Sequence, residues 1–151
     1  MRLVAFRTLL VLALMSGVPA RAATDRIIKV LPQFLDLKGR NSVSPSLYDR
    51  DAYQARLRRR PEDCSGMEFQ VQWKAKSSSD LKMKLEVRGS KDGQSTTGSS
   101  EALVRHVRGL NKWTPLVLKG APYEQVGEII AWRVSLWDGE KLLAEQKSFL
   151  W

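Results

Sequence analysis

The clearest signal for the fold is the stretch Met67-Glu68-Phe69-Gln70-Val71-Gln72-Trp73-Lys74-Ala75, in which every odd position is apolar and every even position is polar. The same alternation returns at Leu81-Lys82-Met83-Lys84-Leu85-Glu86-Val87-Arg88, after a predicted turn at 77–80. A period of two is that of a β-strand with one buried face. Each stretch is therefore predicted to be a strand of an all-β domain, with its odd positions in the core.

Five further strands can be placed outward from this pair. Pro32 interrupts the first of them, and Asp138-Gly139 predicts a hairpin between the last two. The tract 89–100 is rich in Gly, Ser and Thr and is predicted to be a flexible loop. The further strands are expected at 27–31 continued by 34–37, at 102–107, at 113–118, at 129–137 and at 142–151.

About seven strands with frequent turns are typical of an antiparallel β-sandwich. In strand count and spacing, residues 27–151 resemble immunoglobulin-like and fibronectin III-like domains, and Trp73 lies on an early central strand as in that class. The resemblance implies a fold that hosts binding, adhesion and scaffolding more often than catalysis.

One segment, 46–60, lacks the period of two. Ser46 can cap a helix, arginines fill the last turn, and Pro61 ends it. We expect a short helix at about 47–59, inserted after the first strand.

The first 22 residues have the pattern of a signal peptide. Arg2 and Arg7 precede an apolar run at 8–18 that is too short to span a bilayer, and Ala20-Arg21-Ala22 offers small residues for cleavage. Cleavage after Ala22 would leave residues 23–151 as a single exported domain, periplasmic or extracellular, without a membrane span.

The chain is basic, with 25 Lys and Arg against 16 Asp and Glu and a net charge of +9. Loss of three arginines with the signal peptide lowers the charge to +6. This charge favours anionic partners, although it would also serve simply to keep an exported domain soluble. The only cysteine, Cys64, excludes an intramolecular disulfide, so we expect it to be a small buried side chain or a free thiol.

Catalytic and metal-binding patterns are not recognisable in the sequence. Cys64 and the only histidine, His106, fall in unrelated segments, and the carboxylates are flanked by arginines. We therefore expect no catalytic residue, no cofactor and no metal.

The sharpest electrostatic feature is the run Arg56, Arg58, Arg59 and Arg60 at the end of the expected helix. It is a candidate site for anionic groups. The alternative is that the arginines only neutralise the helix dipole and nearby carboxylates.

The last hairpin gives a second candidate. If Leu136 is opposite Leu142, one face is suitable for the core, Arg133 lies opposite Glu145 and Ile129 opposite Phe149. Either the inserted helix covers the other face through Tyr48, Tyr53 and Leu57, or a partner or sugar does. The residues of this candidate face are Ile129, Trp137, Leu143, Phe149 and Trp151.

Together these features predict a non-enzymatic binding or structural module at the cell envelope, monomeric or weakly associating. A protein partner and an anionic or neutral polysaccharide remain open, whereas nucleic acid is not expected. The alternative functions are a carbohydrate-binding accessory domain that uses exposed Trp residues, or an anionic-polymer binder that uses the arginine-rich helix end.

Overall fold

The computed structural model describes residues 25–76, 80–105 and 112–151. The expected signal peptide and His106 lie outside the described residues. Within the described part of the chain, no helix is long and apolar enough to cross a membrane.

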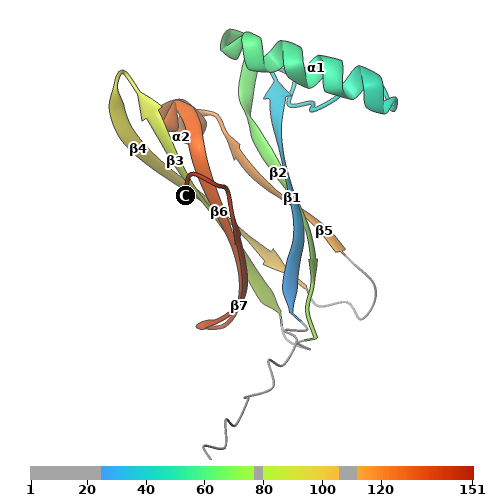
Figure 1. Cartoon of the computed structure of the whole chain (residues 1–151), viewed down its shortest axis with the longest axis vertical. Coiled ribbons are helices and arrows are strands. Elements are labelled where there is room, and N and C mark those ends of the chain that lie inside the picture. The colour runs from blue at the N-terminus through green and yellow to red at the C-terminus, as the bar shows by residue number, and fades with distance from the viewer. Residues whose placement is uncertain (1–24, 77–79, 106–111) are drawn as a thin grey trace, which may run out of the picture.

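Within these described ranges, seven antiparallel strands form two sheets that face each other (Figure 1). One sheet has the order β1-β2-β5 and the other β4-β3-β6-β7. The predicted all-β sandwich of about seven strands is therefore confirmed. The strands are β1 (Arg26–Asp36), β2 (Cys64–Lys74), β3 (Leu81–Lys91), β4 (Gln94–Val104), β5 (Lys112–Lys119), β6 (Glu128–Asp138) and β7 (Lys141–Lys147).

The core lies between the sheets and is built by the two alternating stretches. Phe69 of β2 packs edge-on against Trp132 of β6, with ring centroids 6.3 Å apart. Trp73 is buried on β2, the central strand of its sheet, and its indole N–H donates to Thr114 Oγ1 at 2.9 Å. The odd positions of β2 and β3 are buried as predicted: Met67, Phe69, Val71, Trp73, Leu81, Met83, Leu85 and Val87.

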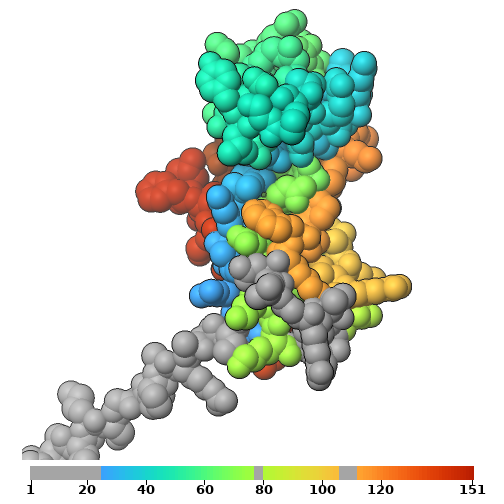
Figure 2. Space-filling model, turned by 90° about the vertical axis from the view of Figure 1, so that its right-hand side faces the viewer, coloured from blue at the N-terminus to red at the C-terminus, as the bar shows by residue number. Residues whose placement is uncertain are grey.

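The inserted helix forms where the sequence predicts it. Helix α1 (Leu47–Arg59) is capped by Ser46, whose side chain accepts from the Asp49 amide, and a short 3₁₀ turn (Pro61–Asp63) follows it. It lies across the end of β1 and β2, as Figures 1 and 2 show. The expectation that it covers the outer face of the last hairpin is therefore wrong.

The tract 89–100 is a β-hairpin rather than a flexible loop. Asp92 and Gly93 both adopt positive φ, of 51° and 77°, which is the two-residue turn that matches the twist of a hairpin. The small residues of β4 leave room for a second helix, α2 (Ala121–Val126), in the segment between the strands expected at 113–118 and 129–137. A Cβ added at Gly98 would lie 2.5 Å from Val126 Cγ2, so glycine here serves packing rather than flexibility.

The register of the last hairpin also differs from the prediction. Leu136 lies opposite Ala144, not Leu142, and Arg133 lies opposite Lys147, not Glu145. The turn is one residue tighter than expected, and a bulge at Leu143 adds a second shift. Strand β7 ends at Lys147, so Phe149 does not pair with Ile129. The bulge takes Leu143 out of the alternation of β7, so its side chain does not lie on the face predicted for it.

Candidate functional site

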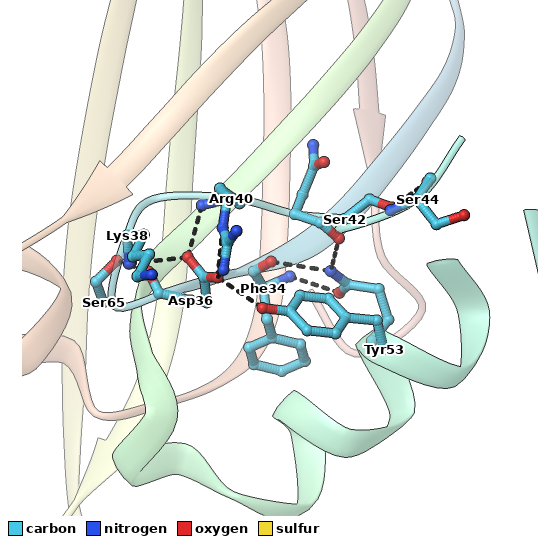
Figure 3. Close-up of polar contacts among 10 residues, drawn as sticks. Phe34, Asp36, Lys38, Arg40, Ser42, Ser44, Tyr53 and Ser65 are labelled. Carbon is cyan, nitrogen blue, oxygen red and sulfur yellow. Dashed lines mark hydrogen bonds and ion pairs between the residues drawn. The ribbon is translucent and has the colours of Figure 1, made fainter. Parts of the chain in front are cut away.

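A polar cluster centred on Asp36 holds α1 against the sandwich (Figure 3). Tyr53 of α1 donates its hydroxyl to Asp36 Oδ2 at 2.6 Å, and Arg40 Nε donates to the same oxygen at 2.9 Å. Arg40 Nη2 forms an ion pair with this oxygen at 2.8 Å. The amides of Lys38 and Arg40 both reach Oδ1 at 2.8 Å. Every acceptor site of this buried carboxylate is used, so the cluster is a structural anchor rather than a site open to a ligand.

Gln54 continues this anchor along the free edge of β1. Its side-chain oxygen accepts from the Phe34 amide at 2.7 Å, and its amide group donates to the carbonyls of Phe34 and Asn41 at 2.9 and 2.7 Å. The helix thus supplies the hydrogen bonds that a neighbouring strand would make, and it protects the edge of the sheet.

The Asp36 carboxyl group ties stability to pH. Burial alone would raise its pKa, but the hydrogen bonds from Tyr53, Arg40 and the Lys38 amide outweigh burial and hold the pKa well below its ordinary value. The unfolded chain therefore binds a proton at higher pH than the folded chain does. The stabilisation is present above about pH 4 and is lost as the pH falls below that value.

Tyr53→Phe should lower the free energy of unfolding at pH 7 by about 1.5–3 kcal/mol, since a hydrogen bond to a charged group is lost. The difference between this variant and the parent should shrink as the pH is lowered towards 2, because Asp36 of the variant has lost one hydrogen bond, takes up a proton at a higher pH than Asp36 of the parent, and so recovers part of the loss. Urea unfolding at a series of pH values measures both effects. Tyr48→Phe is the matched control, since Tyr48 lies on the same helix and is 82% exposed. A Tyr53→Phe deficit that is independent of pH would contradict this role.

The arginine run does not converge on one site. The Arg56 guanidinium lies 4.7 Å from the Tyr53 ring centroid, and Arg59 Nε donates to the Ala55 carbonyl at 3.2 Å. Arg60 caps the helix and pairs with Glu62 and Asp63, each at 3.3 Å. Arg58 borders a separate cleft of about 490 Å³ between α1, α2 and β6. Among the described residues, no two of these four arginines share a partner.

The five residues of the second candidate face separate into three groups. Ile129 and Leu143 pack against the core, so their predicted place on the outer face is wrong. Irregularities in the pairing of β6 at both ends turn these side chains inward. Phe149 is fully exposed in the C-terminal segment, which projects from the side of the sandwich in Figure 2. Trp137 and Trp151 lie on the outer face of the four-stranded sheet.

Trp151 forms one wall of a polar cleft on that outer face. Beyond β7 the chain makes a turn and returns across the sheet (Figure 1). In this turn the Trp151 amide donates a hydrogen bond to the Ser148 carbonyl at 3.2 Å. The indole ring then lies 4.2 Å from the Arg88 guanidinium carbon and 4.8 Å from that of Arg133. The cleft has a volume of about 420 Å³ and is lined by Lys84, Glu86, Val87, Arg88, Thr97, Gly98, Ser99, Arg133 and Trp151.

Ion pairs fix most of the charges in this cleft. Arg133 Nη2 and Nε donate to Glu86 Oε2 at 2.7 and 3.0 Å, and Lys84 Nζ lies 3.4 Å from Glu86 Oε1. Partial burial alone would raise the pKa of Glu86, but Arg133 and Lys84 lower it below its ordinary value. Glu86 therefore remains a carboxylate at neutral pH and can accept hydrogen bonds from a ligand.

Trp137 extends the same face along β6. Its indole N–H donates to Ser135 Oγ at 2.8 Å, which places the ring over the next outward position of the strand. Towards the N-terminus of β6, the next side chain on this face is Arg133, and the Trp151 ring lies over it. Four residues of extended strand span about 13 Å, so the two indoles border a surface long enough for a ligand of more than one ring.

The sequence indicates the tryptophans of this site, but it does not show which charged residues come together there. Glu86 and Arg133 come from segments far apart in the chain, and only the pairing of β3 with β6 places them opposite each other. Thr97 and Ser99 fall in the tract that was expected to be a loop. The alternation at 81–88 does assign Lys84, Glu86 and Arg88 to the outer face, but nothing in the sequence places Trp151 above them.

No protein-family model matches the chain, and comparisons with curated proteins and with solved structures give no significant match. The protein is therefore described by its fold and its cleft alone. It is an all-β sandwich with a polar cleft, bordered by an indole ring, on the outer face of its larger sheet.

Proposed function

We propose that the protein is an exported, non-enzymatic binding module of the cell envelope, and that it binds carbohydrate in the cleft beside Trp151. The observation that carries the proposal is the indole held beside a cleft of about 420 Å³ that is lined with hydroxyl, carboxylate and guanidinium groups. Indole rings pack against the apolar faces of sugar rings, while polar groups around them bind the sugar hydroxyls. Export is proposed from the signal-peptide pattern of the first 22 residues.

Further support comes from the groups that Trp151 brings within reach of one ligand. Thr97 and Ser99 present hydroxyls from β4, and Glu86 presents a charged acceptor from β3. These groups come from two neighbouring strands of a rigid sheet, which suits recognition without conformational change. Glu86, the carboxylate among the described side chains of the lining, is held in ion pairs with Arg133 and Lys84, and we propose binding rather than catalysis.

We also propose that the sandwich is of the fibronectin III-like type. Its fourth strand pairs with β3 in the four-stranded sheet, whereas constant-type immunoglobulin domains place the fourth strand in the same sheet as the first, second and fifth.

Trp151→Ala should weaken binding to a glycan array by at least about tenfold, because truncation of a central aromatic contact commonly has an effect of this size or larger. The thermal unfolding midpoint should change little, since Trp151 lies on the surface of the sheet. Trp113→Ala is the matched control: Trp113 is 47% exposed, lies on the other sheet, and should be dispensable. Binding that depends on Trp113 and not on Trp151, or binding to no glycan, would contradict the proposal.

A further inference from the structure

The cations of the Trp151 cleft are not equivalent. Arg133 is paired with Glu86 and lies 3.8 Å from Glu145, and Lys84 is also paired with Glu86. Lys82, further along β3, lies 3.9 Å from Glu101. Among the residues that the structure describes, Arg88 has no carboxylate within ion-pairing distance.

The charge balance of the cleft follows from these pairs. Among the side chains that line the cleft, three are cations, Lys84, Arg88 and Arg133, and one is a carboxylate, Glu86. The positive charge that no carboxylate neutralises is therefore that of the Arg88 guanidinium. A neutral sugar would leave this excess uncompensated, whereas a ligand with an anionic group would neutralise part of it.

The surroundings of Arg88 also restrict its guanidinium. The Trp151 ring lies 4.2 Å from the guanidinium carbon, a cation–π contact that limits the rotamers of a long side chain. Thr97 lies directly across the β3–β4 pair from Arg88 and places a hydroxyl on the same face. A guanidinium held in this way needs little further ordering to bind a planar carboxylate through two parallel hydrogen bonds.

We infer that the saccharide bound in this cleft is acidic, a uronate whose carboxylate pairs with Arg88 while its ring packs beside Trp151. The inference rests on the proposed carbohydrate-binding function and specifies its ligand class. Arg88 is thus the residue that selects acidic over neutral sugars, and Glu86, held by Arg133 and Lys84, accepts hydrogen bonds from ring hydroxyls.

The test compares an acidic oligosaccharide with its neutral methyl ester. Tetragalacturonate and its fully methyl-esterified form are titrated calorimetrically into the full domain and into Arg88→Gln. We expect the parent protein to bind the acid at least about tenfold more tightly than the ester, with a preference that weakens as salt is raised. Arg88→Gln should bind both forms with similar, weak affinity. Lys141→Gln, which removes an exposed cation at the far end of β7, is the control that should keep the preference.

The outcomes separate this inference from the proposed function. Equal binding of acid and ester by the parent protein would overturn the assignment of an acidic ligand and leave carbohydrate binding standing. A preference for the acid that persists in Arg88→Gln would overturn the role of Arg88. Binding of neither form, together with Trp151-independent results on the glycan array, would overturn both.

Discussion

Leu57→Ala is expected to lower the free energy of unfolding by about 2–4 kcal/mol, the usual range for truncating a fully buried leucine. Leu57 is 0% exposed, and it lies on the face of α1 that packs on the end of the sandwich beside Tyr53. The loss should be seen as a lower urea midpoint with little change in the slope of the transition.

The matched control is Leu47→Ala on the same helix, where the side chain is 66% exposed and the change should be within about 0.5 kcal/mol. Replacement of Arg59 and Arg60 by Gln should likewise leave stability nearly unchanged, since both side chains are exposed. If Leu57→Ala were as mild as these variants, α1 would not be anchored as the structure has it.

Gly98→Ala is expected to destabilise the domain by about 1–3 kcal/mol through overpacking, although the substitution adds only one methyl group. The new Cβ would lie 2.5 Å from Val126 Cγ2 and 3.1 Å from Val87 Cγ2, both on β-branched side chains that are fully buried. Ser95→Ala in the same strand is the control, because Ser95 is exposed.

A double-mutant cycle with Val126→Ala isolates this contact. Removing the two methyl groups of Val126 makes room for the new Cβ, so the double variant should be more stable than the sum of the single effects predicts, by about 0.5–3 kcal/mol. Additive effects within experimental error would show that α2 does not pack on β4 at Gly98.

The sequence predicts the fold wherever one residue type signals one structure. The alternation at 67–75 and 81–88 indicates which side chains form the core, and Ser46, the terminal arginines and Pro61 bound the helix. The prediction of a loop for the Gly, Ser and Thr tract is wrong because small residues are typical both of loops and of strands that another element approaches closely. The contact of Val126 with Gly98 shows that the tract is a strand and not a loop, and this tertiary contact cannot be recognised in the sequence.

The sequence predicts only part of the candidate site, again because tertiary contacts decide the rest. The register of the last hairpin depends on the tight turn after Asp138 and on the bulge at Leu143. The pair Asp138-Gly139 indicates that a turn forms but not its register, and the bulge has no sequence signal of its own. The bulge turns Leu143 towards the core, and a separate irregularity in the pairing of β3 with β6 turns Ile129 inward. Strand β7 ends at Lys147, and Trp151 lies over the outer face of the sheet. The selective residue, Arg88, is recognisable only after the pairs Glu86–Arg133 and Lys82–Glu101 show which cations are already neutralised.

The most direct test of the central claim is an NMR titration that follows the indole N–H signals of the tryptophans while tetragalacturonate is added. If carbohydrate binds on the outer face of the four-stranded sheet, the Trp151 signal should shift progressively to saturation, while those of the buried Trp73 and of Trp113 on the other sheet stay in place. A saturating shift at Trp113 with none at Trp151 would contradict the account.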